Sequence, residues 1–292
     1  MPRRASDLEW SLTLFTMTMQ LACGLAMAAT LLDLGMRRWA SEPVRYLGVA
    51  VFPLVAIGVL LSLFHLGHPF AAWKSFLNFG RSRLSLEIVV TTIFALSSLF
   101  YSAFWLMGIA RFRLALGTGT VLLGLATVLA SAAIYMVRTQ PFWNSGWLPL
   151  SFLGTTLLFA GLVPTTFRGL LPDDTSARPF LGATMVGGLS LLVSAIWMFR
   201  RFCRLGQGRL ASAHLQGERP VLSPWSIVPF GLYVLLTGIL PSAMALASWS
   251  TANDWANLLF ARFSLPTFVL ISLGAVVGRA LTYLAGTSLS RF

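Results

Sequence analysis

The sequence predicts an all-α membrane protein, a polytopic bundle of about eight transmembrane helices forming one transmembrane domain over residues 1–292. The first observation is composition: 57% of the residues are hydrophobic and only 10% are charged, whereas soluble domains average about 25% charged residues. The second is that the apolar residues form long runs, separated by short basic or Gly/Pro-rich breaks. The third is that these runs lack the alternation of a membrane β-barrel. Because open sheet edges are not tolerated in lipid, helices are the remaining solution.

Eight apolar runs are long enough to cross a bilayer core of about 30 Å, which takes roughly 20 helical residues. In chain order the predicted spans are 10–32, 47–66, 86–107, 117–137, 149–167, 180–199, 225–248 and 264–287. The first run is too long for a cleaved signal sequence, so Arg3 and Arg4 are interpreted as residues flanking a membrane helix. The longest polar stretch, 200–224, is predicted as a loop and is too short for a separate soluble domain.

The charge and the metal-binding residue types exclude several classes of site. The net charge of +12 does not indicate nucleic-acid binding, because the 21 Lys and Arg residues are scattered over the loops and form no single stripe. Cys23 and Cys203 make no CxxC motif, so no Fe–S cluster or zinc site is expected within this chain. His65 and His68 end the second span and His214 lies in the polar loop. Haem is therefore not expected, since it needs histidines on facing helices.

Ionisable residues inside a membrane span are costly and commonly mark function. Asp33 closes the first span, where interfacial water can solvate it. Glu87 is predicted in the first turn of the third span, and Arg279 lies well inside the last apolar run. No chain of such groups crosses the membrane, which disfavours a proton pump. The sequence also lacks the internal repeats and Gly/Pro-broken helices typical of transporters, so a small-solute transporter is the less favoured alternative.

Four segments carry a recognisable pattern. The most specific is HLGHPFAAWKSFLNFGRSRLSLEI, and the others are EWSLTLFTMTMQLACG, YMVRTQPFWNSGWLPLSF and GRALTYL. The matching residues are Glu9, Trp10, Phe15, Thr16, Gln20, Gly24, His65, Leu66, Gly67, Pro69, Ser75, Gly80, Ser82, Leu84, Ser85, Glu87, Ile88, Tyr135, Pro141, Trp143, Trp147, Pro149, Gly278, Arg279 and Tyr283. With these residues the sequence resembles the membrane-anchor subunits of dimethyl sulfoxide reductase-type molybdoenzymes, the DmsC-like proteins.

The resemblance implies an anchor subunit that acts as a quinol dehydrogenase module without its own metal. In that family the anchor binds menaquinol and passes electrons to an Fe–S subunit with four [4Fe–4S] clusters. The Fe–S subunit feeds a molybdenum bis-pterin catalytic subunit that reduces an S- or N-oxide in anaerobic respiration. The residues at the positions of His65 and Glu87 are implicated in quinol oxidation, and Trp143, Arg279 and Tyr283 are further candidate quinol-binding residues. The anchor of a different quinone-linked oxyanion reductase would look almost the same.

The predicted topology agrees with one quinol site. An even number of predicted spans separates the end of the second span, at His65, from the other motifs, which places all of them on one face of the membrane. An imidazole and an interfacial carboxylate suit proton transfer from a quinol. Structural roles remain open: His65 as a helix-end group, Glu87 as a helix cap, Trp143 and Trp147 as belt or docking residues. Arg279 either pairs with a carboxylate such as Glu87 or snorkels to the interface.

Two arguments on membrane sidedness conflict. Lys and Arg are more numerous on the motif-bearing face, which the positive-inside rule would place in the cytoplasm. The resemblance instead places the termini and the docked subunits in the periplasm, and an acidic partner would account for the arginines of 200–224. We expect a multi-pass protein of the bacterial inner membrane. Its partner subunits are expected to dock on the loops 66–85 and 138–148, on the periplasmic side.

Overall fold

The computed structural model describes residues 10–35, 42–65, 73, 77, 80–138, 141–166, 178–213, 224–250 and 254–290. The helices of this part of the chain are α1 (Trp10–Gly35), α2 (Glu42–His65), α4 (Arg83–Leu106), α5 (Arg113–Tyr135), α6 (Trp147–Thr166), α7 (Arg178–Ala213), α8 (Pro224–Tyr233), the π-helix η4 (Val234–Ile239), α9 (Leu240–Ser250) and α10 (Asp254–Ser290). No β-strand occurs among the described residues. The all-α prediction is confirmed.

Eight helical segments are long and apolar enough to cross a membrane, as predicted. They are Trp10–Gly35, Val44–Phe64, Arg83–Leu106, Arg113–Tyr135, Trp147–Thr166, Arg178–Arg204, Ile227–Trp249 and Leu265–Leu284. The prediction of a loop from residue 200 is wrong for its first half, because α7 continues to Ala213. The Arg, Leu, Gln and Ala residues there have high helix propensity, so the helix extends beyond its apolar run. His214 lies outside the described residues.

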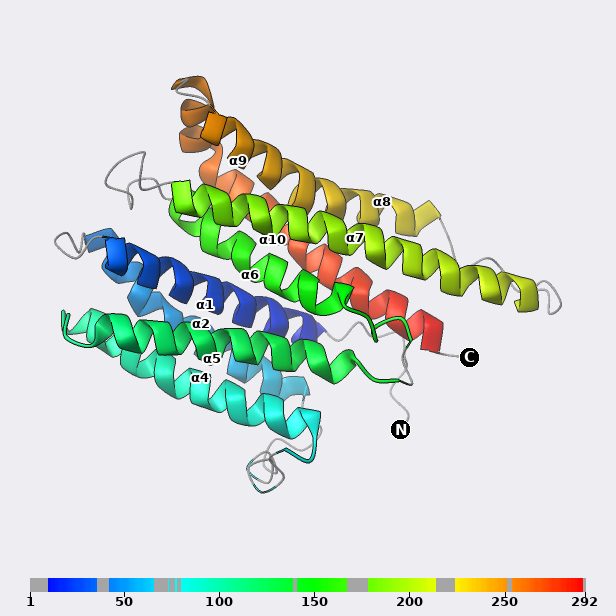
Figure 1. Ribbon diagram of the computed structural model, residues 1–292, viewed down its shortest axis with the longest axis horizontal. Helices are drawn as coiled ribbons and strands as arrows, with labels where there is room; N and C mark the ends of the chain where they lie inside the picture. The colour runs from blue at the N-terminus through cyan, green and yellow to red at the C-terminus, as the bar shows by residue number, and fades with distance from the viewer. Residues whose placement is uncertain are drawn as a thin grey trace.

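The bundle consists of two groups of helices that meet along α1 and α6 (Figure 1). One group contains α1, α2, α4 and α5, and the other contains α6, α7, α10 and the span formed by α8, η4 and α9. Helices α1 and α6 approach closely at Gly24. A Cβ atom there would lie 2.7 Å from the Thr156 carbonyl oxygen and 2.9 Å from the Ala160 nitrogen. Small residues at helix crossings permit such contact in membrane bundles.

The seventh span changes its helical geometry in the middle. Helix α8 continues directly into the π-helical turn η4 and then into α9, a local change that the hydropathy pattern does not predict. The last residue of α8, Tyr233, packs against Gly278 of α10, where a Cβ atom would lie 2.2 Å from the tyrosine ring. This contact fixes the turn of α10 that immediately precedes Arg279.

The ends of the helices alternate between the two ends of the bundle. One end of the bundle lies at the right in Figure 1. Helices α1, α4, α6 and α8 begin there, and helices α2, α5, α7 and α10 end there. We call this the motif end, because the predicted site residues on α2, α4 and α10 belong to it. Helices α1 and α4 finish, and α5 begins, at the opposite end.

Candidate functional site

Glu87 lies between α4 and α5 at the motif end. Helix α4 begins at Arg83 with Ser82 as its N-cap, so Glu87 is in the second turn and the prediction of a first-turn position is wrong. A capping role is not supported, because first-turn positions are the ones that cap or complement a helix start. The partly buried carboxyl group instead accepts a hydrogen bond from Ser131 Oγ of α5 at 2.5 Å. The antiparallel pairing of the two helices brings these groups together.

An aromatic cluster lies beside Glu87. Tyr135 at the end of α5 and Tyr283 of α10 have ring centroids 5.3 Å apart, with an interplanar angle of 47°. Trp143, in the segment before α6, packs edge-on against Tyr135 at 5.4 Å. The Trp143 Nε1 group donates to the carbonyl oxygen of Thr282 at 2.9 Å. The segment between α5 and α6 is therefore tied to the motif end of α10.

Arg279 is buried close to the same two tyrosines. Its exposed fraction is 4%, its Cζ atom lies 3.5 Å from the centroid of the Phe152 ring, and its Nη2 group donates to Gln20 Oε1 at 3.1 Å. The arginine therefore neither snorkels nor forms an ion pair with Glu87 in the described part of the chain. Arg279 Nε and Nη1 and Gln20 Nε2 have no hydrogen-bond partner among the described residues. A buried cation with unpaired donors is costly, so these groups require an acceptor beyond the described residues.

The structure thus brings four predicted residues into one region: Glu87, Trp143, Arg279 and Tyr283. Glu87 and Arg279 both lie within electrostatic range of the two clustered tyrosines. The fifth predicted residue, His65, is the last residue of α2, which packs beside α4. Its side chain lies outside the described residues, so its distance from Glu87 stays a prediction.

Four further residues of this region, Ser131, Tyr135, Thr16 and Gln20, are not among the site residues predicted from the sequence. Thr16 Oγ1 lies 3.4 Å from Tyr283 Oη, and the other three make the contacts described above. A signal for them exists in the sequence. Polar residues spaced four apart occur within apolar runs at Thr16 and Gln20, Ser131 and Tyr135, and Arg279 and Tyr283, and residues with this spacing share one face of a helix.

The predicted docking contacts are only partly available. Trp147 is buried and its Nε1 group donates to the Phe142 carbonyl oxygen at 3.2 Å, so its assignment as an interface or belt residue is wrong. The ring is buried because it packs against Phe142 within the core. Arg83 donates to carbonyl oxygens at the end of α5, including Ala133 at 2.7 Å. Arg81 and Arg138 are exposed at the motif end.

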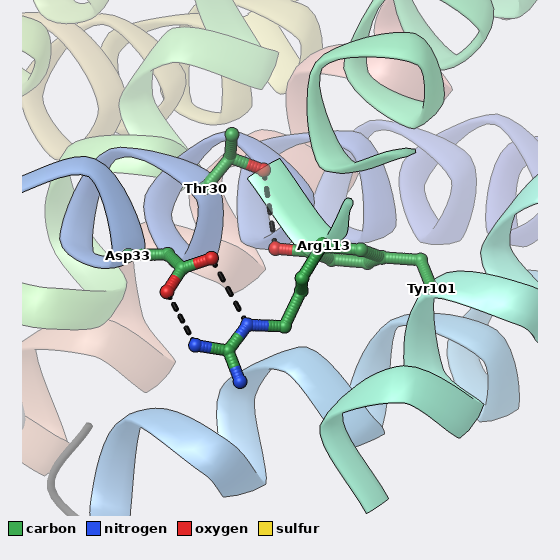
Figure 2. Close-up of polar contacts among 4 residues, drawn as sticks. All are labelled: Thr30, Asp33, Tyr101 and Arg113. Carbon is green, nitrogen blue, oxygen red and sulfur yellow. Dashed lines mark hydrogen bonds and ion pairs between the residues drawn. The ribbon is translucent and has the colours of Figure 1, made fainter. Parts of the chain in front are cut away.

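A second polar cluster lies at the opposite end of the bundle (Figure 2). Arg113 of α5 pairs with Asp33 of α1 through Nη2–Oδ1 and Nε–Oδ2 contacts of 2.5 and 3.0 Å, and the Arg113 Cζ atom lies 3.8 Å from the Trp105 ring centroid. Thr30 and Tyr101 share a hydrogen bond of 3.1 Å beside them. The interpretation of Asp33 as solvated by interfacial water is therefore wrong, because its charge is matched within the bundle.

Known proteins resemble this sequence over nearly its whole length. The family model of the DMSO reductase anchor subunit (DmsC) matches residues 5–285. The C subunit of the anaerobic dimethyl sulfoxide reductase of Escherichia coli (strain K12) is 28% identical over an alignment of 285 residues, which covers 94% of this protein and 94% of that subunit. The corresponding C subunit of Haemophilus influenzae is 29% identical over 172 residues, 55% of this protein and 61% of its own length. The YnfH subunit of an anaerobic dimethyl sulfoxide reductase of E. coli is 31% identical over 194 residues, 64% of this protein and 66% of its own length.

Proposed function

Because the protein belongs to the family of dimethyl sulfoxide reductase anchor subunits, we propose that it binds menaquinol at the motif end and passes the electrons to an Fe–S partner subunit. The observation that carries the proposal is that a carboxyl group and unpaired buried donors both lie near Tyr135 and Tyr283. A quinol needs both kinds of group, since it loses protons and develops negative charge on its oxygens.

Glu87 is the proposed proton acceptor, together with His65. Oxidation of a quinol to the quinone releases two protons and two electrons, and the protons require a base close to the hydroxyl groups. The Ser131 hydrogen bond fixes one carboxyl oxygen of Glu87, so the group is held in one orientation. An imidazole titrates near neutral pH and suits the second transfer. The sequence contains no ligand motif for haem or Fe–S clusters, so we propose that both electrons pass to a centre in the partner subunit.

Arg279, Gln20 and Tyr283 are the proposed groups for the other quinol oxygen. The unpaired guanidinium and amide donors would stabilise negative charge on an oxygen that is losing its proton. Preorganised donors of this kind are effective because they are desolvated before the charge develops. The aromatic rings of Tyr135 and Trp143 supply apolar faces for a flat ligand. Tyr283 is held between α1 and α5 by its contacts with Thr16 and Tyr135.

We further propose that the protein belongs to a complex with an Fe–S subunit and a molybdopterin catalytic subunit. The relatives are named as subunits of anaerobic dimethyl sulfoxide reductases, which supports an S- or N-oxide as terminal acceptor. A different oxyanion as terminal acceptor is the alternative. Because the electrons must leave near the quinol, the partner is expected to dock on the loops 66–85 and 138–148, where Arg81 and Arg138 are exposed. We propose that this face is on the periplasmic side of the inner membrane.

The decisive experiment replaces Glu87 in the assembled complex. Glu87→Gln keeps the shape of the side chain and an acceptor for Ser131 but removes the base, so menaquinol-dependent reduction of dimethyl sulfoxide should fall at least about a hundredfold. Reduction driven by a viologen dye, which donates directly to the soluble subunits, should be unchanged. Menaquinol turnover at the wild-type rate by the variant would refute the proposed site. Purification of the wild-type protein without iron and molybdenum subunits would contradict the proposed complex.

A further inference from the structure

A groove of about 460 Å³ lies on the outer side of α7, near its motif end. Its lining residues are Val193, Ile196, Trp197, Arg200, Arg201 and Arg204. Gly146, in the segment before α6, flanks the groove, since a Cβ atom there would lie 3.1 Å from the Trp197 ring. The groove is separate from the proposed quinol site, because none of its lining residues contributes to the cluster around Glu87 and Arg279.

The groove has an apolar half and a cationic half. Val193, Ile196 and Trp197 are 53%, 60% and 44% exposed, as expected for side chains that face lipid. One and two turns further along α7, respectively, Arg200 and Arg204 are also exposed. The apolar run of α7 ends at Phe199, and Arg200 is the first charged residue after it. The two guanidinium groups therefore belong to the level of the lipid headgroups, and the apolar residues to the adjoining hydrocarbon region.

We propose that this groove binds an anionic phospholipid, with its phosphate at Arg200 and Arg204 and an acyl chain along the apolar half. Arg200 and Arg204 are four residues apart and share one face of the helix. Neither makes a hydrogen bond or ion pair to a described residue, which leaves their planar donors available for phosphate oxygens. Basic pockets beside membrane helices recognise anionic headgroups in this way, and Trp197 has the amphipathic side chain typical of the interface.

The neighbouring Arg201 distinguishes this lipid site from a general basic surface. Its guanidinium group turns toward the bundle and donates through Nε to the Pro141 carbonyl oxygen at 2.8 Å and through Nη2 to that of Asn144 at 3.3 Å. It therefore has a structural role, and among the described residues that line the groove Arg200 and Arg204 remain for an external anion. An acidic protein surface would match the arginines but not the adjoining exposed apolar residues. A phospholipid matches both halves.

The proposal is tested by native mass spectrometry of the full-length protein in a mild detergent, with phosphatidylglycerol or phosphatidylcholine added. The wild type should bind phosphatidylglycerol in preference to phosphatidylcholine. The double variant Arg200→Gln/Arg204→Gln should bind it about tenfold more weakly, because both charge-assisted contacts are lost. Arg178→Gln is the matched control, since Arg178 is an exposed arginine at the other end of the same helix. This control should bind phosphatidylglycerol as the wild type does.

Two further measurements keep the test decisive. The melting temperature of the double variant without added lipid should match that of the wild type. If the double variant is unstable, the single variants Arg200→Gln and Arg204→Gln replace it, and each should bind phosphatidylglycerol more weakly than the wild type. Glycerol 3-phosphate at equal concentration should not displace the lipid, because it lacks the acyl chain. Unchanged phosphatidylglycerol binding by the double variant, or full displacement by glycerol 3-phosphate, would overturn the proposal.

Discussion

The two ends of the bundle treat their buried charges differently. At the opposite end, Asp33 and Arg113 neutralise each other through two contacts, and the guanidinium group also lies over Trp105. At the motif end, Glu87 is bound by a hydroxyl group and Arg279 by an amide, although both lie within electrostatic range of the same tyrosines. The first arrangement is complete within the protein. The second leaves an acid and a cation apart, each able to interact with a ligand between or beside them.

Three helices contribute to both arrangements. Helices α1, α4 and α5 supply polar side chains to each cluster, and α10 adds Arg279 and Tyr283 at the motif end. The two clusters also differ in which charges are paired. A paired cluster is expected to hold helices together, whereas an unpaired one is retained at a cost in stability and therefore implies a function.

The largest expected effect on turnover concerns the motif end. His65→Ala should lower menaquinol-dependent turnover about a thousandfold, because it removes a proposed proton acceptor, while the complex still assembles on membranes and accepts electrons from a viologen dye. His68→Ala is the control, since His68 is also beside the end of the second span but is not assigned to the site. Equal losses in both variants would indicate that the segment, and not one imidazole, is required.

The next effect concerns stability at the opposite end. Arg113→Gln leaves the partly buried Asp33 carboxylate without its partner, which should cost about 3 kcal/mol in the free energy of unfolding. A lowered melting temperature of the purified complex would report this loss, with menaquinol turnover per folded molecule unchanged. Arg111→Gln is the control, because Arg111 is close in sequence but exposed over the Phe112 ring.

The double variant Asp33→Asn/Arg113→Gln separates lost packing from an unpaired charge. It should be more stable than Arg113→Gln alone, since no buried charge is left uncompensated. If the single and double variants melt at the same temperature, the ion pair does not stabilise this end and the contrast between the two ends fails.

Replacing Arg279 should give the reverse pattern. Arg279→Gln should reduce menaquinol turnover about a hundredfold, because it removes preorganised donors, but should leave the melting temperature close to that of the wild type. The reason is that no carboxylate among the described residues pairs with Arg279, so its replacement leaves no such charge without its partner. Arg279→Lys retains the charge and should recover part of the activity. A melting temperature lowered as far as in Arg113→Gln, with turnover per folded complex intact, would make Arg279 a structural residue.

The sequence predicted the spans well because hydropathy is a local property. It predicted tertiary partners poorly because those depend on residues far apart. Asp33 appeared solvated since its partner Arg113 follows two spans later, and Trp147 appeared exposed since nothing in its segment indicates the packing on Phe142. Glu87 was placed one turn too near the start of its helix, because α4 begins with polar residues that lie outside the apolar run. The sequence thus identified candidate residues by their type and position, but it did not predict their tertiary contacts.

Ser131 is a residue whose partner only the structure identifies, and its replacement should have the smallest effect. Its spacing from Tyr135 marks a polar face of the helix, but only the structure shows that its Oγ group holds the Glu87 carboxyl at 2.5 Å. Ser131→Ala should reduce menaquinol turnover about tenfold, the value of one hydrogen bond to a charged group, with viologen-driven activity unchanged. Ser131→Thr restores the hydroxyl group and should recover most of the turnover.

Thr127 provides the matched control for this positioning role. It lies one turn earlier on α5, is equally buried, and its hydroxyl group donates only to the Leu123 carbonyl oxygen of its own helix at 3.0 Å. Thr127→Val should therefore leave turnover unchanged. If Thr127→Val and Ser131→Ala lower turnover equally, or if Ser131→Thr fails to recover it, the loss reflects packing of α5 and not the orientation of Glu87. A loss confined to Ser131→Ala would support a role for the orientation of Glu87 in quinol oxidation. It would also show that the polar contacts at the motif end serve turnover, unlike the Asp33–Arg113 ion pair at the opposite end.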